Sequence, residues 1–178
     1  MGIGRTASQK CSALAIAAAL VCATPASAAP AGWAKASDLV RSGLVIGAVG
    51  IPAADRDWRG AEQDAIAMAV AGGATAALKY AIHERRPDGS DDNSFPSGHT
   101  SISFAAAAGL EQRFGWKVGI PAHLAAAFVG LARVKADKHY WHDVLVGAAI
   151  GEAAGLLLVD KHRNRGKPPI GAGLRIAF

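Results

Sequence analysis

The chain has 178 residues, which is enough for one domain with its own core, and no internal repeat is visible in it. Its 19 lysines and arginines exceed its 14 acidic residues only slightly. A basic excess this small and this dispersed does not indicate a nucleic-acid-binding protein. The sequence therefore indicates a single domain whose partners are not nucleic acids.

The first 28 residues have the pattern of an export signal. Two basic residues precede an apolar run from Cys11 to Ala23, and an A-x-A cleavage site ends at Ala28. The sequence therefore predicts a signal peptide over residues 1–28 and an exported domain over residues 29–178, in the periplasm or at a membrane. Retention of the same run as an anchoring first helix is the alternative, although thirteen residues are few for crossing about 30 Å of hydrocarbon.

Cleavage after Ala28 restricts the chemistry of the exported part. Both cysteines, Cys11 and Cys22, lie in the removed segment, so no thiol is left for a disulfide, a nucleophile or a zinc–cysteine site. The removed segment also carries Arg5 and Lys10 and no acid, so the formal charge falls from +5 to +3.

Helix signals dominate the rest of the chain. Alanine is abundant, strand signals are sparse, and apolar residues come in long blocks separated by charged, turn-rich segments. We therefore predict an all-α fold, a compact bundle of about five helices. The tail over residues 165–178 does not fit the bundle, and a short strand, a docking segment and disorder stay open for it. The predicted helices lie near Asp38–Ala54, Gly60–Glu84, Gly98–Phe114, Trp116–Val134 and Trp141–Asp160.

The sequence leaves membrane embedding open. The helical blocks contain charged residues such as Lys79, Glu111 and Glu152, and a rough hydropathy sum for the exported part is only slightly above zero. The block at residues 143–160 could still line a bundle interior with Glu152 and meet lipid elsewhere. Membrane association and a soluble periplasmic domain are both compatible with this pattern.

The segment SFPSGHTS at residues 94–101 marks the predicted start of the third helix. Pro96 is compatible with a helix start, Ser97 is a preferred N-cap residue, and Gly98 lets a ligand approach the backbone N–H closely. Free N–H groups and the positive end of the helix dipole bind anions there, phosphate above all. His99 lies in the first turn beside that position. A plain capped helix with a surface histidine is the alternative interpretation.

Two further segments offer groups that a bound anion needs. Lys79, at the end of a predicted helix, and Arg86, followed by Pro87 in the next loop, can converge on one oxyanion. His139 and Asp143 are four residues apart, so on a helical turn the carboxylate can hold one ring nitrogen protonated and leave the other as a nucleophile or base. Solvated helix ends and a surface ion pair are the alternatives for these segments taken alone.

Taken in order, these segments resemble the signature of the type 2 phosphatidic acid phosphatase superfamily, which also includes bacterial acid phosphatases and vanadium haloperoxidases. The resemblance extends from Lys79 to Asp143. The chain departs from the family at Ala132, where a serine is usual. Its exported part is shorter than the soluble acid phosphatases and matches five of the six helices common in the membrane-bound lipid phosphatases. The matching patterns are Lys79-x6-Arg86-Pro87, Pro96-Ser97-Gly98-His99 and Arg133-x5-His139-x3-Asp143.

The resemblance implies a phosphate-binding cradle. Lys79, Arg86 and Arg133 would bind the phosphoryl oxygens and neutralise charge in the transition state. Ser97 and the Gly98 N–H would complete the cradle.

The resemblance also implies three catalytic residues. His139 would attack phosphorus and form a phosphohistidine, and Asp143 would orient it. His99 would protonate the leaving oxygen and then activate water. The cations take the place of a metal, so no cofactor is expected.

A metal centre is the alternative for the turn that contains His139, His142 and Asp143. No third protein ligand with comparable spacing is evident in the sequence, and the surrounding arginines repel a cation. The other histidines, at positions 83, 123 and 162, have no evident partner and are interpreted as structural or solvated.

The predicted function is a metal-independent phosphatase that hydrolyses a phosphate monoester or pyrophosphate, with a phosphorylated lipid as the favoured substrate. A periplasmic acid phosphatase on small soluble phosphomonoesters and a non-catalytic anion-binding protein are the alternatives. A vanadate-dependent haloperoxidase is a further option, although no dedicated halide site is evident. The sequence does not indicate an oligomeric state.

Overall fold

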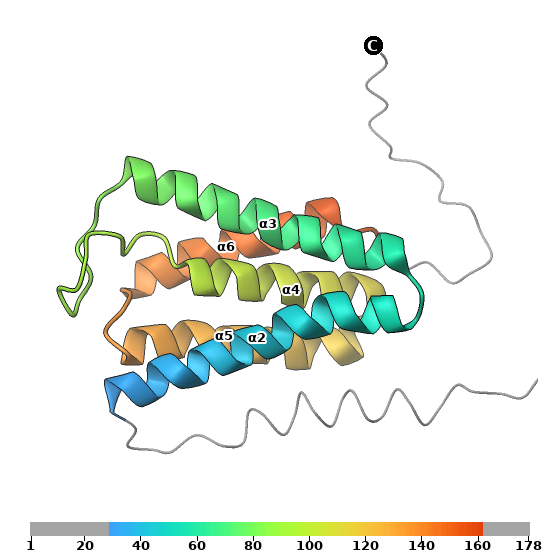
Figure 1. Cartoon of the computed structure of the whole chain (residues 1–178), viewed down its shortest axis with the longest axis horizontal. Coiled ribbons are helices and arrows are strands. Elements are labelled where there is room, and N and C mark those ends of the chain that lie inside the picture. Colours follow the sequence, from blue (N-terminus) through green and yellow to red (C-terminus); the bar gives the residue numbers. More distant parts are fainter. Residues whose placement is uncertain (1–28, 162–178) are drawn as a thin grey trace, which may run out of the picture.

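The computed structural model describes residues 29–161 of the chain. Over these residues the chain forms five α-helices, with no strand beyond an isolated bridge between Glu84 and Asn93, which confirms the predicted all-α bundle (Figure 1). The predicted signal peptide and the tail at residues 165–178 lie outside the described residues, so both stay predictions. The helices are α2 (Pro30–Ala54), α3 (Trp58–Ala81), α4 (Gly98–Phe114), α5 (Trp116–Lys135) and α6 (Trp141–Leu158).

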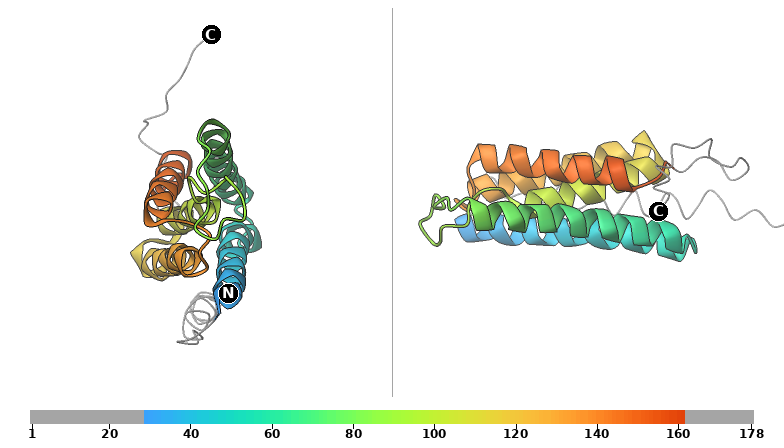
Figure 2. Two further views of the ribbon diagram at one scale, coloured as in Figure 1. Left: turned by 90° about the vertical axis from the view of Figure 1, so that its left-hand side faces the viewer. Right: turned by 90° about the horizontal axis from the view of Figure 1, so that it is seen from above.

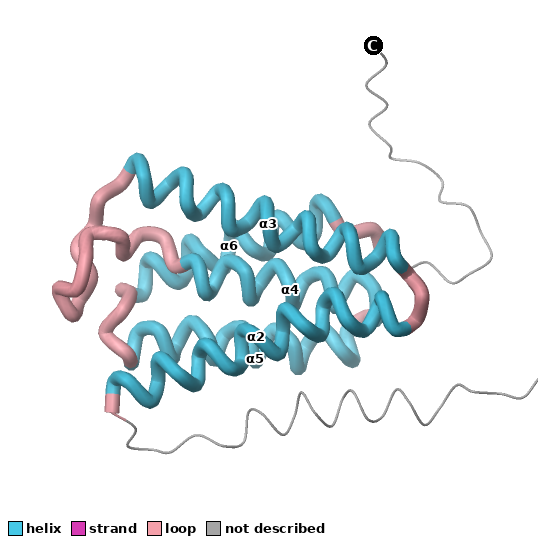
Figure 3. Tube along the Cα trace, viewed as in Figure 1, coloured by secondary structure: helices cyan, strands magenta, loops and turns pink. Residues whose placement is uncertain are grey.

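The central helix is α4. It packs against each of the other four described helices, and the end-on view in Figure 2 shows them arranged around it. The loop between α3 and α4, the turn between α5 and α6 and the start of α2 all lie at one end of the bundle (Figure 3). The N-terminus of α4 therefore opens at the end that carries the loop at residues 82–97.

Two helix ends differ from the prediction. The first helix begins at Pro30, eight residues before the predicted start at Asp38, because a proline fits the first helical position and helix-forming alanines follow it. The second helix ends at Ala81, three residues before the predicted end at Glu84. Glu84 pairs with the loop instead, since its carbonyl accepts from the Ser94 N–H at 2.8 Å. The remaining boundaries agree to within two residues.

The interior of the bundle is built from small side chains, and many large apolar side chains lie outside. Alanines dominate the buried set, together with serines and threonines, whereas Leu157 is 83% exposed and Ile46 is 70% exposed. Small residues allow close helix contacts, and an apolar outer surface suits lipid better than water. The helices α2, α5 and α6 are also long and apolar enough to cross a membrane. These features support membrane association of the chain.

A row of glycines on α6 allows its backbone to touch that of α4. A Cβ added at Gly151 would lie 2.1 Å from the carbonyl oxygen of Ser101, and one added at Gly147 would lie 2.6 Å from that of Ser97. Only a residue without a Cβ fits such a contact. The contact fixes the first turns of α6 against the first turns of α4.

We expect Gly151→Ala to destabilise the fold, although alanine is the better helix former. The added Cβ would overlap the Ser101 carbonyl and force α6 away from α4, at a cost of about 1–3 kcal/mol. Gly73→Ala on α3 is the matched control, because an added Cβ there meets nothing within 4 Å. It should stabilise the helix by roughly 0.5–1 kcal/mol. Thermal unfolding in one detergent compares both variants with the parent, and equal Tm values for the two variants would contradict the glycine contact.

Candidate active site

All three predicted segments meet at the loop-bearing end of the bundle, the left-hand end in Figure 1. Lys79 lies in the last turn of α3 and Arg133 in the last turn of α5, while α4 begins after Ser97 and α6 begins after His139 and Tyr140. These segments are also tied to one another, since the Ser97 N–H donates to the backbone carbonyl of residue 143 at 3.0 Å. Residues far apart in sequence are thus brought to one end of the molecule.

His139 and Asp143 form a buried pair at the start of α6. His139 is 3% exposed and Asp143 is fully buried, and 3.4 Å separate Nδ1 of the imidazole from Oδ2 of the carboxylate. The Tyr140 N–H (2.9 Å) and the Ser94 hydroxyl donate to the same oxygen. Because an ionised carboxylate only accepts, the ring proton belongs on Nδ1. The lone pair of Nε2 is therefore free to act as a nucleophile.

The charges around His139 keep its imidazole neutral. Burial makes the largest contribution to lowering its pKa, and the positive charges of Arg133, Lys79 and Arg86 lower it further. Asp143 acts in the opposite direction. A neutral imidazole is the nucleophilic form, so the cations that can bind an anion also prepare the histidine that would react with it.

Arg133 acts on both histidines of the site. It is 7% exposed, and its charge lowers the pKa of His139 and of His99 alike. Among the described residues, its buried Nε has no hydrogen-bond partner. Buried donors without a partner are rare in folded proteins, and a guanidinium binds phosphate or carboxylate strongly. This donor set fits an anion.

Lys79 and Arg86 are held by the loop that joins α3 to α4. Nζ of Lys79 donates to the carbonyls of Asn93 (2.6 Å) and Ser94 (3.0 Å), and Nε of Arg86 donates to Oδ1 of Asp91 (2.7 Å). The contact with Asp91 uses one of the five N–H donors of the guanidinium, which leaves the terminal nitrogens for an anion. Burial, followed by the charge of Arg86, lowers the pKa of Lys79 to about 8.

The N-terminus of α4 is formed differently from the prediction for Ser97. Ser97 occupies the N-cap position and is fully buried, but its hydroxyl makes no capping hydrogen bond. It accepts instead from the Thr100 hydroxyl at 2.9 Å. The N–H groups of the first turn, from Gly98 onwards, therefore have no side-chain cap. Together with the helix dipole they can bind an anion.

His99 is paired with a residue that no sequence motif singled out. Its Nε2 lies 2.7 Å from Oδ1 of Asp38 on α2. Burial, then the charges of Arg133 and Arg41, lower the pKa of His99 to about 4, and Asp38 acts in the opposite direction. A phosphate dianion beside the ring would also favour its protonated form. Asp38 and Arg41 lie one turn apart on α2, but no pattern in the sequence links that helix to the site.

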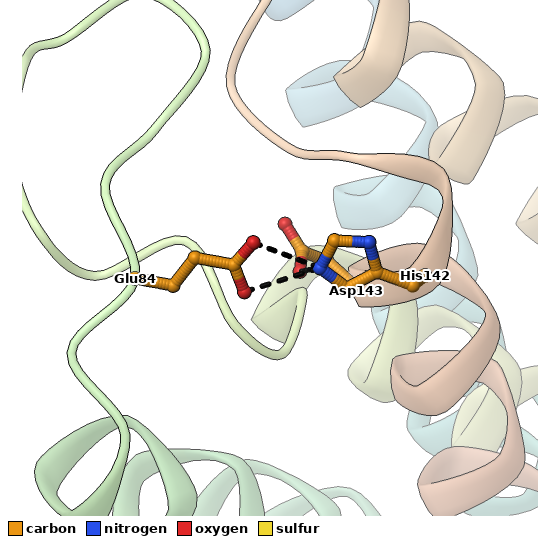
Figure 4. A group of neighbouring side chains, drawn as sticks. All are labelled: Glu84, His142 and Asp143. Carbon is orange, nitrogen blue, oxygen red and sulfur yellow. Dashed lines mark hydrogen bonds and ion pairs between the residues drawn. The ribbon is translucent and has the colours of Figure 1, made fainter.

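Glu84 and His123 also differ from the sequence interpretation. Nε2 of His142 lies 2.8 Å from Oε1 of Glu84, so the structure brings to His142 and Asp143 a third group that the sequence did not reveal (Figure 4). His123 has a partner that the sequence did not reveal, because its Nε2 lies 3.0 Å from Oε2 of Glu152, and this pair agrees with a structural role. That pair joins α5 to α6 and takes no part in the site described above.

A cavity of about 300 Å³ lies at the same end of the bundle. Its walls are alanines and a proline from the start of α2, with Asp88, Asp137 and Lys138 from the neighbouring turns. None of the residues predicted to bind phosphate lines it. The site is therefore assigned from its convergent charged groups and not from this cavity.

Comparisons with known proteins connect these residues to one family. The model of the PAP2 superfamily matches residues 65–167. A lipid A 1-phosphatase of Porphyromonas gingivalis is 39% identical over 97 residues, which is 53% of this chain and 22% of that protein. A lipid A 4'-phosphatase of Helicobacter pylori is 28% identical over 133 residues, which is 68% of this chain and 66% of that protein. The chain thus spans about a fifth of the first relative and about two thirds of the second.

A solved structure has the same fold. The crystal structure of a transmembrane PAP2 type phosphatidylglycerolphosphate phosphatase from Bacillus subtilis matches with a TM-score of 0.50 and covers 86% of each chain. The two sequences are 22% identical, so this likeness shows the fold alone.

We expect the affinity of the site for inorganic phosphate to fall above pH 8. Lys79 loses its charge as the pH rises through its pKa of about 8, while phosphate stays a dianion. Kd should therefore rise by up to about tenfold per pH unit. Lys79→Arg keeps its charge, so its Kd should stay flat over the same range. Calorimetric titration in detergent measures both proteins, and an equally steep rise in the arginine variant would rule out this role of Lys79.

Proposed function

We propose that this chain, which belongs to the PAP2 superfamily, is a metal-independent phosphatase that hydrolyses a phosphate monoester or pyrophosphate of a lipid through a phosphohistidine. The observation that carries the proposal is the buried pair of His139 and Asp143 among the charges of Lys79, Arg86 and Arg133. Phosphoryl transfer needs a nucleophile, a group that orients it and positive charge around the transferred group. The printed names of the two relatives, both lipid A phosphatases, support the lipid class.

Phosphate binding is assigned to the cations and to the start of α4. Lys79, Arg86 and Arg133 would hold the phosphoryl oxygens, with the unpartnered Nε of Arg133 among the donors. The N–H groups at Gly98, supported by the buried Ser97, would hold a further oxygen. Fixed donors stabilise the transition state most, because charge spreads over the equatorial oxygens as the bond to the leaving group breaks.

The chemical step is assigned to His139. Its Nε2 lone pair forms a bond to phosphorus while the bond from phosphorus to the leaving oxygen breaks, and the product is a phosphohistidine. Asp143 keeps the proton on Nδ1 and stabilises the positive charge that the ring acquires. Burial of the pair excludes water that would weaken this interaction.

Proton transfer is assigned to His99. It donates a proton to the leaving oxygen, then takes a proton from the water that attacks the phosphohistidine and releases phosphate. Asp38 is a positioning residue for this step. Its carboxylate contacts Nε2 of His99 and favours the protonated ring against the charges of the nearby arginines.

The substrate is assigned to a membrane surface. The helix α5 has 20 residues and a length of about 30 Å, which equals the thickness of the hydrocarbon core. Because the site lies at one end of the bundle, it would lie near the bilayer surface, where the phosphate groups of lipids are found (Figure 1). Export through the predicted signal peptide would place the chain in the periplasm or at the membrane facing it.

Hydrolysis of p-nitrophenyl phosphate in detergent with EDTA tests the chemistry. Activity should survive the chelator, fall with vanadate and drop by about 10³-fold or more in His139→Ala. In His99→Ala the aryl leaving group can depart without a proton, so the phosphohistidine should still form, but its hydrolysis lacks the base that activates water. The intermediate should therefore accumulate, and radioactive substrate should label the protein with a phosphate that is labile in acid and stable in base. Phosphate binding without turnover in the parent chain would favour an anion-binding protein instead.

Dioctanoyl phosphatidic acid and glycerol 3-phosphate form the matched pair that tests the substrate class. Both carry the same phosphoglycerol group, and only the first has acyl chains that can lie along the apolar outer surface. We expect kcat/KM to be at least about tenfold higher for the lipid, since burial of a few methylene groups supplies more than 1.4 kcal/mol. Equal values would indicate an acid phosphatase for small soluble esters.

A further inference from the structure

We propose that Glu84, His142 and Asp143 form a binding site for one zinc ion, and that zinc bound there inhibits the enzyme. Glu84 lies in the loop after α3, and the other two residues lie in the first turn of α6 (Figure 4). Each residue offers one ligand atom, and the three atoms lie within 4.8 Å of one another. This set includes a ligand from a distant segment, which the sequence pattern of the turn could not reveal.

The separations of the carboxylate oxygens from Nε2 of His142 are close to those between the ligands of a tetrahedral ion. Nε2 of His142 lies 2.8 Å from Oε1 and 3.1 Å from Oε2 of Glu84, and 3.1 Å from Oδ1 of Asp143. A zinc ion with ligands at about 2.0–2.2 Å in tetrahedral geometry requires donors roughly 3.3–3.6 Å apart. Imidazole nitrogen and carboxylate oxygen are both common zinc ligands. Small side-chain adjustments would therefore complete the geometry, and a fourth position would remain for water.

A second observation, independent of the spacing, is an unpartnered carboxylate oxygen. Asp143 is fully buried, and its Oδ2 already accepts from Ser94 and Tyr140. Its Oδ1 has no hydrogen-bond partner among the described residues, although it lies close to Nε2 of His142. A proton on Nε2 is directed to Glu84 and leaves this oxygen unsatisfied. A cation would satisfy all three ligand atoms at once.

The ring of His142 is also held in position. It stacks on Tyr140 with centroids 5.4 Å apart and planes 8° apart, and the Phe95 ring lies 6.0 Å from it. Its side chain is 56% exposed, so an ion can reach it from the solvent. The nearby lysine and arginines oppose cation binding, but two carboxylates neutralise the two charges of the ion. The net charge of the loaded site is therefore zero.

Inhibition follows from the shared carboxylate. Asp143 orients His139 through Oδ2, and an ion on Oδ1 would withdraw negative charge from the same group. The imidazolium formed during phosphoryl transfer would then be less stabilised. The ion would also hold Glu84 against α6. Glu84 lies only two residues before Arg86, so the position of Arg86 in the phosphate cradle would be restrained as well. This consequence rests on the proposed function, whereas binding of the ion does not.

Binding is tested on the full chain in detergent, purified without a histidine tag. Zinc should raise Tm, and cobalt should produce the visible absorption band of a tetrahedral site, whereas magnesium should do neither. Glu84→Gln and His142→Ala should each weaken binding, so that the zinc concentration that produces half of the maximal Tm shift rises by about tenfold or more. His123→Ala removes a carboxylate-paired histidine outside the site and should leave it unchanged. An unchanged response in both site variants overturns the proposal.

Turnover of p-nitrophenyl phosphate tests the inhibition. Zinc at the concentration that saturates the Tm shift should lower kcat of the parent by about tenfold or more. A tenfold loss corresponds to about 1.4 kcal/mol less stabilisation of the His139 imidazolium by Asp143 in the transition state. His142→Ala should keep its zinc-free activity within about threefold of the parent and resist zinc. Equal inhibition of both proteins would place the zinc on His99 or His139 and overturn the proposal. A parent without turnover in any condition would contradict the proposed function, while Tm and the cobalt band still decide on the ion site.

Discussion

The site depends on the buried carboxylate of Asp143. Its Oδ2 accepts from Ser94 in the loop and from the Tyr140 N–H at the start of α6, and it contacts Nδ1 of His139. The backbone carbonyl of the same residue accepts from Ser97 at the start of α4. A buried acceptor shared among several donors is strongly coupled to each of them, since its loss leaves all of them unpaired. One residue thus positions both His139, the proposed nucleophile, and the helix end proposed to bind phosphate.

This arrangement requires α4 and α6 to lie closer than ordinary side chains allow. The glycines at positions 147 and 151 meet that requirement, and the alanines of α4 extend the close contact along the bundle. A core of small residues buries little apolar area, so it supplies a weak driving force for folding in water. In lipid, helices associate through close packing and hydrogen bonds instead. The same composition that gives a precise site therefore also favours a membrane environment.

The helices and the family were predictable because their signals are local. Apart from the start of the first helix, apolar blocks and turn residues determine the helix ends to within three positions, and the match to the PAP2 superfamily confirms the resemblance of the three motifs. The partners of the motif residues were not predictable, because they depend on how helices lie against each other. Asp38 meets His99 only because α2 lies beside α4, and Glu84 meets His142 only because the loop folds back. The same holds for Ser97, whose buried hydroxyl accepts from the Thr100 hydroxyl and does not cap the helix.

The distribution of charge explains how Lys79, Arg86 and Arg133 can lie close together without a bound anion. Acidic residues from the surrounding elements lie beside the site, with Asp91 against Arg86 and Asp38 against His99, whose lowered pKa of about 4 leaves its ring neutral. These acids are about half exposed, so water weakens their attraction and leaves part of the positive charge unneutralised. Arg133 is more deeply buried and has no ion pair among the described residues, and its Nε lacks a partner. In the proposed mechanism an entering phosphate would therefore gain most from Arg133, the cation with the fewest partners in the protein, whose charge also lowers the pKa of both His99 and His139.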